Sequence, residues 1–339
     1  MHQLPEGVIP VLLLVGILDI LRRTFGILHF CWIHFFVRND LSMYGANRSK
    51  TYEDGKQSKR KRSEAFAIVT GASAGIGRAL AWEIASRGMN LIIVARTTSA
   101  LEELKIEIQK KFPGTQVEIC VLDCYNIQEA TTALQAKCRE FGVTMLINNV
   151  GCESGEPEPL AEKSRTNLQN IIDLNITFNA QLTRVCLAPL IENCQALSCR
   201  GIVISLASQA ALLENPLISS YSAAKAFNTS FSRALAGEMR HHHNSLVDIC
   251  NLRPAFVESA MSGLKAEGIK GLLLGVVKPD YFACVAVNKF GHLDDVSPVM
   301  LHDLTGKFLT SLPKFLKEWF LYKLSSRRYS LRKAGIKDD

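Results

Sequence analysis

Short apolar runs alternate with helix-like periodic segments through the middle of the chain. Most of the runs are four to seven residues long, and they are rich in β-branched residues and bounded by turn residues. This pattern predicts buried strands. Strands that alternate with helices form parallel sheets, so we expect an α/β fold, with one doubly wound parallel sheet and helices on both faces. The predicted strands are 65–69, 90–94, 117–122, 145–147, 201–207 and 247–252.

Two apolar runs precede this region, at residues 8–21 and 25–37, and Arg22-Arg23 separates them. A transmembrane helix needs about 20 apolar residues, so each run is marginal, and the pattern allows one span or two. Residues 1–7 contain no Lys or Arg, which disfavours a cleaved signal peptide. We therefore expect a retained membrane anchor over residues 1–40.

Residues 41–63 are rich in Lys, Ser, Asp and Gly, and end on the Lys59-Arg-Lys-Arg62 cluster, which predicts an exposed basic linker. An apolar anchor upstream favours contact with anionic lipid over a nuclear signal. Basic residues on the C-terminal side of the anchor also favour a cytosolic location for the following domain.

Charge is concentrated at the two ends of the chain. The net charge is +7, and residues 1–63 and 314–339 together carry +10, which leaves −3 for the middle. A slightly acidic domain disfavours nucleic acid as a partner, and basic ends favour a membrane surface.

A second amphipathic segment lies near the C-terminus, where apolar residues recur at three- to four-residue spacing and Pro313 interrupts the pattern. The pattern allows two interpretations: the helix packs on the domain, or it lies in the bilayer interface. We place the domain over residues 64–310 and an amphipathic helix with a basic tail over 311–339. The apolar positions are Leu304, Phe308, Leu312, Phe315 and Trp319.

Cysteine and histidine residues show no metal-binding pattern. The ten cysteines include no Cys-x-x-Cys and no zinc-site spacing, so they are expected to be reduced and buried. The His241–His243 triplet follows a predicted helix end, where the helix dipole favours imidazolium. We predict no metal site.

A glycine-rich turn, Thr70-Gly-Ala-Ser-Ala-Gly-Ile-Gly77, joins the first predicted strand to a helical pattern. Its glycines let the backbone approach a pyrophosphate that is held by helix N-terminal amides, as in Rossmann-like sheets. Ser73 can donate to the same phosphates. This turn predicts a dinucleotide cofactor.

Arg96 follows the second predicted strand, where NAD-selective enzymes place an acidic residue against the ribose hydroxyls. A guanidinium attracts a 2′-phosphate, so the cofactor is expected to be NADP(H). The competing interpretation is an arginine that caps exposed loop atoms.

Tyr221 and Lys225 are four residues apart at the start of a predicted helix, which places both side chains on one face. Ser208 follows the fifth predicted strand, at the sheet edge where ligands bind in open α/β folds. A phenol transfers protons poorly near neutral pH unless a cation favours phenolate. We expect the Lys225 charge to lower the pKa of Tyr221.

These motifs, in this order and with Asn148-Asn-Val-Gly151, resemble the short-chain dehydrogenase/reductase family over residues 64–310. A finer resemblance is to the membrane-bound 17β-hydroxysteroid dehydrogenase and very-long-chain 3-oxoacyl-CoA reductase group. It rests on Arg87-Gly-Met-Asn90, the Ser297-Pro pair and His302.

The resemblance implies a role for each site residue. Tyr221 would protonate a carbonyl oxygen that Ser208 holds, while NADPH delivers hydride to the carbon. Lys225 would bind the nicotinamide ribose, and Asn175 would support a water relay. The expected catalytic residues are Asn175, Ser208, Tyr221 and Lys225, and the expected cofactor-binding residues are Thr70, Gly71, Ser73, Gly75, Ile76, Gly77, Arg96, Asp123, Asn149, Tyr221, Lys225, Pro254 and Val257.

One position departs from the family pattern. Pro254 is followed by Ala255 where family members usually carry glycine. If that backbone requires a positive φ, alanine is strained by about 1 kcal/mol and weakens cofactor binding. Residues 256–274 are the expected substrate loop, with Met261, Leu264 and residues 272–274 suited to an apolar ligand.

The expected function is NADPH-dependent reduction of a lipid ketone at the endoplasmic reticulum membrane, with a long-chain 3-oxoacyl-CoA of fatty-acid elongation as the leading substrate. A 17-ketosteroid is the alternative, and a catalytically silent membrane-bound scaffold is a third interpretation. An acyl-CoA would need basic residues such as Lys265 or Lys270 near its phosphates. A homo-oligomer is compatible with this function.

Overall fold

Seven strands form one parallel sheet in the order β3-β2-β1-β4-β5-β6-β7. The computed structural model describes residues 8–46, 64–153, 157–259, 263–267, 271 and 275–333. All six predicted strands are present, within one to three residues at their ends. The strands are β1 Ala65–Thr70, β2 Asn90–Ala95, β3 Val117–Val121, β4 Gly142–Asn148, β5 Gly201–Leu206, β6 Val247–Leu252 and β7 Asp295–Val296.

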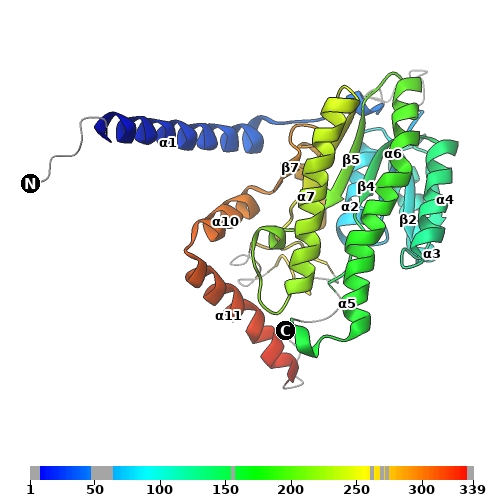
Figure 1. Ribbon diagram of the computed structural model, residues 1–339. Coiled ribbons are helices and arrows are strands. Elements are labelled where there is room, and N and C mark those ends of the chain that lie inside the picture. The colour runs from blue at the N-terminus through cyan, green and yellow to red at the C-terminus, as the bar shows by residue number, and fades with distance from the viewer. Residues whose placement is uncertain are drawn as a thin grey trace, which may run out of the picture. The chain divides into compact units, whose positions relative to one another are not determined.

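Helices cover both faces of the sheet, as the sequence predicts. Apolar side chains of α4, α6 and α7 pack with the sheet in one buried cluster, and these helices cover the near face in Figure 1. Helices α2, α3 and α9 pack on the other side. Their bounds are α2 Gly75–Ser86, α3 Thr98–Lys111, α4 Ile127–Glu140, α6 Phe178–Ala196, α7 Ser219–His242 and α9 Pro279–Val287.

The strand order reverses beside β1. The chain runs from β1 outward to β2 and β3, and then returns to β4 on the other side of β1. In open α/β sheets, ligands bind outside the carboxyl ends of the strands at such a point. The glycine-rich turn after β1 lies there.

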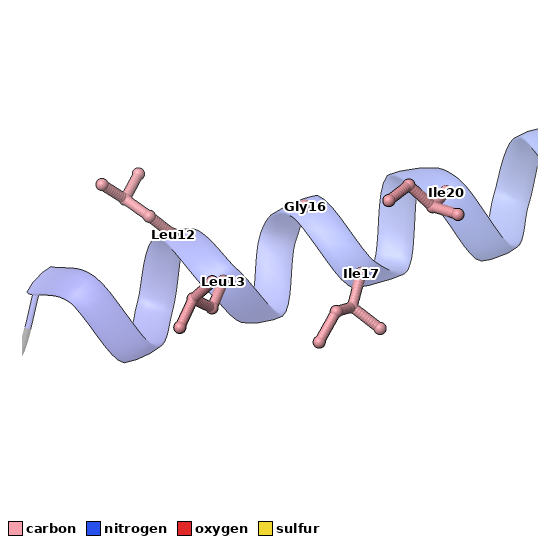
Figure 2. A pocket seen from close by; sticks show the side chains of 5 residues that line it. All are labelled: Leu12, Leu13, Gly16, Ile17 and Ile20. Atoms are coloured by element: carbon pink, nitrogen blue, oxygen red, sulfur yellow. The ribbon is translucent and has the colours of Figure 1, made fainter.

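The N-terminal unit, residues 1–38, is separate from the unit formed by residues 39–339. The two predicted apolar runs lie in one continuous helical stretch, α1 Val8–Cys31 followed by a π-helical turn at Trp32–Phe36. Its large apolar side chains from Val11 to Leu28 are exposed. Among the described residues, no helix meets the length and apolar character of a membrane span. Figure 2 shows a hollow along α1 that is lined by Leu12, Leu13, Gly16, Ile17 and Ile20.

Residues 39–46 belong to the second unit, although the sequence assigns most of them to the linker. Leu41 and Tyr44 are fully buried. The Tyr44 hydroxyl donates to Asp248 at 2.8 Å, and Thr144 donates to the Tyr44 carbonyl oxygen at 2.7 Å. This segment is therefore part of the domain, whereas the remainder of the predicted linker, residues 47–63, lies outside the described residues.

The C-terminal amphipathic segment forms two helices rather than one, α10 Met300–Ser311 and α11 Lys314–Lys333. The break is at Pro313, where the sequence predicts an interruption. Residues 334–339 of the predicted basic tail lie outside the described residues.

Candidate active site

The glycine-rich turn folds so tightly that a side chain would have no room at Gly71 or Gly77. Gly71 and Gly75 have φ values of +68° and +56°, in the region that glycine adopts most readily. A Cβ atom on Gly77 would lie 2.2 Å from the Gly71 carbonyl oxygen. No side chain of the described residues caps the N-terminus of α2, which begins at Gly75. Its first amides are therefore available to an anion at the helix N-terminus.

Thr70 and Asn149 hold this turn in place. The Thr70 hydroxyl is fully buried, donates to the Ile147 carbonyl oxygen at 3.0 Å, and accepts from the Asn149 and Val150 amides at 3.0 and 3.2 Å. The Asn149 side-chain amide donates to the carbonyl oxygens of Thr70 and Gly71 at 2.9 and 3.3 Å. Both side chains are thus occupied by backbone groups, which gives them a bracing role.

Arg96 and Asp123 follow the carboxyl ends of the neighbouring strands β2 and β3, and each contacts Tyr125. Arg96 is exposed, and its guanidinium carbon lies 5.8 Å from the centre of the Tyr125 ring. The Asp123 carboxylate accepts the Tyr125 amide at 3.1 Å. Tyr125 was not predicted as a site residue, and no motif marks it. Ser73 and Ile76 are half-buried in the neighbouring glycine turn.

Asn175 lies in a π-helical turn, Asp173–Thr177, between α5 Arg165–Ile172 and α6. Such turns are rare in proteins overall, but many of those that occur lie at functional sites. The side-chain amide of Asn175 donates to the carbonyl oxygens of Cys152 and Ile171 at 2.7 and 3.0 Å. Its Oδ1 atom is buried and has no hydrogen-bond partner among the described residues. This oxygen can therefore accept a hydrogen bond from a ligand or a water molecule.

Lys225 is 5% exposed, and its Nζ donates to the Leu206 carbonyl oxygen at 2.9 Å. Burial lowers the pKa of Lys225 to about 8, because it disfavours the charged form. A Cβ atom on Gly151 would lie 2.5 Å from Asn175 Oδ1 and 3.1 Å from Lys225 Nζ. Lys225 and Asn175 therefore converge on one small space beside Gly151.

Tyr221 lies near Lys225 and Ser208 in the first turns of α7. The Lys225 Nζ is 5.6 Å from the centre of the Tyr221 ring. Ser208 follows β5, and its hydroxyl accepts the Ala210 amide at 3.1 Å. Ser208 is close enough to Tyr221 for its side chain to act on the pKa of the tyrosine hydroxyl. The structure thus brings Asn175, Ser208, Tyr221 and Lys225 to one edge of the sheet.

The pKa of Tyr221 is raised, which corrects the expectation that Lys225 lowers it. Burial raises the pKa most, the Glu153 carboxylate raises it further, and the Ser208 side chain opposes these effects. Removing a phenolate from water is costly, and Lys225 is itself buried and held by a carbonyl oxygen. Tyr221 is therefore protonated near neutral pH.

The expected strain at Ala255 is absent, because Ala255 is not among the described residues with positive φ. Its amide donates to His302 Nδ1 at 3.2 Å, and His302 Nε2 lies 3.0 Å from the Gly275 carbonyl oxygen. Pro254 accepts the Gln209 amide at 2.8 Å, and Val257 pairs with Val277 in an isolated parallel bridge. Burial lowers the pKa of His302.

Part of the predicted substrate loop lies outside the described residues. This part includes Met261, Lys270 and residues 272–274. Leu264 is half-buried and Lys265 is exposed. The predicted apolar lining therefore stays a prediction.

The sequence model of the short chain dehydrogenase family matches residues 65–269. This is more than half of the chain. The chain belongs to the short-chain dehydrogenase family. The match includes the glycine-rich turn and all four predicted catalytic residues.

Curated relatives carry one recurring name. The chain is similar to the very-long-chain 3-oxoacyl-CoA reductase of Eremothecium gossypii, with 38% identity over 60% of this chain and 57% of the relative. It is also 32% identical to the enzyme of the same name from Candida albicans, over 74% of this chain and 66% of the relative. The chain thus spans little more than half the length of the Eremothecium relative.

Solved structures show the same fold. An alcohol dehydrogenase from Thermococcus sibiricus, complexed with 5-hydroxy-NADP, is 26% identical with a TM-score of 0.57, over 69% of this chain and 93% of that one. A short-chain dehydrogenase from Sphingobium yanoikuyae, in complex with NADPH, has 22% identity and a TM-score of 0.60, over 74% and 97% of the two chains.

Proposed function

We propose that the protein is an NADPH-dependent reductase that converts a long-chain 3-oxoacyl-CoA to the 3-hydroxyacyl-CoA. The observation that carries this proposal is the convergence of Ser208, Tyr221, Lys225 and Asn175 at the sheet edge beside the glycine turn. The relatives named very-long-chain 3-oxoacyl-CoA reductase support the acyl-CoA over a 17-ketosteroid as the ketone.

The residues present fit NADPH. The tight turn at Gly71 and Gly77 and the uncapped N-terminus of α2 suit a pyrophosphate. Arg96, exposed at the end of β2, would hold the 2′-phosphate, and Lys225 would hold the nicotinamide ribose. When bound, this cofactor supplies the hydride. The Thermococcus neighbour, whose structure contains an NADP derivative, supports the same cofactor class.

Tyr221 would give its proton to the substrate oxygen. Its raised pKa keeps the hydroxyl protonated, which suits carbonyl reduction, because the developing alkoxide needs a proton donor. Ser208, whose side chain lies near Tyr221, would hold the same oxygen. The buried environment that raises the pKa of Tyr221 thus keeps the proton that reduction requires on its hydroxyl.

Lys225 and Asn175 would return a proton to Tyr221. Lys225 is close to the Tyr221 ring, and the unpaired Asn175 Oδ1 shares the space beside Gly151 with the Lys225 Nζ. A water molecule in reach of both groups would connect Tyr221 to solvent. With a pKa of about 8, Lys225 is mostly charged at neutral pH and can donate.

We further propose that the enzyme works at the endoplasmic reticulum membrane with its domain facing the cytosol. The exposed apolar side chains of α1 support an attachment to the membrane through the N-terminal unit. The basic residues that follow α1 in the sequence support a cytosolic domain.

The test is NADPH oxidation by the purified full-length protein in detergent, with a long-chain 3-oxoacyl-CoA and a 17-ketosteroid in parallel. We expect turnover with the acyl-CoA and release of a 3-hydroxyacyl-CoA, detected by mass spectrometry. Turnover of the steroid alone would reject the proposed substrate. Inactivity of protein that binds NADPH would reject the enzymatic proposal and favour a silent scaffold.

A further inference from the structure

Helix α11 is fixed to the domain through one of its faces. Leu321 and Ser325 are 3% and 9% exposed, and the Lys317 side chain, one turn earlier, is also largely covered. Leu321 packs with Leu213 and Leu309 in a small apolar cluster. These positions recur every four residues, which defines a single packed face.

Polar contacts tie α11 to two connections of the domain, one between β4 and α5 and one between β5 and α7. Lys317 pairs with Glu214 at 2.5 Å, in the segment between Ser208 and Tyr221. The Tyr329 hydroxyl donates to the Glu162 carboxylate at 2.8 Å, and Lys333 approaches the same carboxylate at 3.6 Å. In Figure 1, α10 and α11 run along one side of the domain, in orange and red.

The opposite surface of both helices is apolar and exposed. Phe315, Trp319 and Tyr322 recur at i, i+4 and i+7 of α11, and they are 69%, 61% and 50% exposed. Leu304 and Phe308 are likewise exposed on α10, at 46% and 62%. We call these five residues the aromatic face. An isolated exposed apolar side chain is ordinary, but five such side chains on two consecutive helices indicate a contact surface.

The charge of α11 identifies the partner. The helix carries seven Lys and Arg residues and one acidic residue, Glu318. Lys323 and Arg327 are exposed on it. Lipid headgroups of anionic membranes are complementary to this charge. Trp and Tyr side chains also favour the boundary between headgroups and acyl chains, because their rings are apolar and their edges polar.

We propose that the aromatic face lies in the headgroup region of an anionic lipid bilayer. This contact is separate from any attachment through α1, and it does not depend on the proposed reaction. Because α11 is tied to the loops at Glu162 and Glu214, the contact would hold that side of the active site at the membrane surface. An apolar substrate dissolved in the bilayer could then reach the site without crossing water.

The test uses tryptophan fluorescence of the full-length protein on vesicles that contain phosphatidylserine and brominated phosphatidylcholine. Bromine quenches tryptophan only at close range in the bilayer. The protein has three tryptophans, and Trp319→Phe removes the one on the aromatic face. We expect the variant to lose part of the quenching, whatever Trp32 and Trp82 contribute. Equal quenching in both proteins would overturn the proposal.

A second pair of variants adds a reporter instead of removing one. Phe315→Trp should gain bromolipid quenching, whereas Ile106→Trp should not. Ile106 is a matched control, because it is 66% exposed on α3, against 69% for Phe315 on α11. Equal quenching at the two positions, or none at Phe315→Trp, would contradict a specific contact at α11.

The charge requirement has its own control. Lys323→Glu with Arg327→Glu should reduce the Trp319 quenching on phosphatidylserine vesicles, whereas Lys110→Glu with Lys111→Glu, exposed on α3, should not.

Light scattering of the detergent-solubilised protein tests a second explanation, in which the aromatic face is a contact between copies of the protein. If Phe315→Ser with Trp319→Ser changes the oligomeric state but not the bromolipid quenching, the aromatic face is a contact between copies, and the membrane proposal is wrong.

Discussion

The two halves of the proposed site use their buried polar atoms differently. In the cofactor half, the Thr70 hydroxyl makes three hydrogen bonds and the Asn149 amide makes two, all to backbone groups. In the chemical half, Asn175 Oδ1 is buried without a partner in the described part of the chain, where Lys225 donates to the Leu206 carbonyl oxygen. The Thr70 hydroxyl and the Asn149 amide are thus occupied by backbone groups, while the side chains of the chemical half keep bonding capacity.

This difference separates residues that hold the cofactor-binding backbone in place from residues that take part in proton transfer. A buried polar group without a partner is costly, so it persists where a ligand or water completes it. The side chains around the glycine turn stabilise the backbone that would hold a cofactor. Those beside Tyr221 are placed for proton transfer. Changes in the chemical half should therefore affect the rate, and changes in the cofactor half should affect folding or cofactor choice.

The largest effect is expected from Tyr221→Phe. Losing the proton donor should reduce kcat with a 3-oxoacyl-CoA by about a thousandfold. NADPH affinity, measured by fluorescence titration, should stay within about threefold, because one hydroxyl next to the ribose contributes little to binding. Retained turnover would contradict the role of Tyr221.

Gly151→Ala should come next. Its Cβ atom would lie 2.5 Å from Asn175 Oδ1 and 3.1 Å from Lys225 Nζ, so these groups must move apart. We expect kcat to fall by about a hundredfold, the effect of a misplacement near 1 Å. Gly237→Ala on α7 is the control, because no neighbouring atom of the described residues lies within 4 Å of its Cβ position. Equal kcat values for these two variants would refute the convergence beside Gly151.

Arg96→Asp probes the cofactor half through selectivity. Replacing the guanidinium by a carboxylate should lower the ratio of kcat/KM for NADPH to that for NADH by about thirtyfold, the value of a charged hydrogen bond. The exposed Arg139→Asp on α4 should leave the ratio unchanged. An unaltered ratio in Arg96→Asp would mean that Arg96 only covers Tyr125.

Thr70→Val should change stability. It leaves the Ile147 carbonyl oxygen and the Asn149 and Val150 amides without their shared partner. The free energy of unfolding should fall by about 2 kcal/mol in urea titration. Thr132→Val on the exposed side of α4 should change it by less than about 0.5 kcal/mol. Similar values for both variants would argue against the brace.

The pH dependence should report Lys225. Its pKa is lowered to about 8, so Lys225 is charged below that pH and neutral above it. If its charge is required, kcat/KM for reduction should be constant below pH 8 and then fall about tenfold per pH unit. The raised pKa of Tyr221 gives no loss in this range. A profile that is flat to pH 10 would exclude this requirement.

Local patterns predicted most of the fold. Buried strands such as β1 and β2 are mostly apolar runs, and they were predicted to within one residue. Strand β7 has only two residues, too few for any pattern. The docking of residues 39–46 was missed because it depends on distant partners such as Asp248 and Thr144.

The residues of the site were predictable from the sequence, but the direction of the Tyr221 pKa shift was not. Sequence spacing placed Tyr221 and Lys225 on one helix face, and the structure brings them together. The direction of the Tyr221 pKa shift depends on burial, which a one-dimensional pattern does not contain. Ala255 shows the same limit, since its backbone angle and its contact with His302 are set by the tertiary fold.

The most direct test of this separation is a single-turnover measurement of NADPH oxidation, with wild type, Tyr221→Phe and Thr70→Val at equal concentrations of folded, cofactor-bound protein. We predict that Thr70→Val keeps the rate within about threefold, while Tyr221→Phe loses about a thousandfold. Comparable rate losses in both variants, or a normal rate in Tyr221→Phe, would contradict the account.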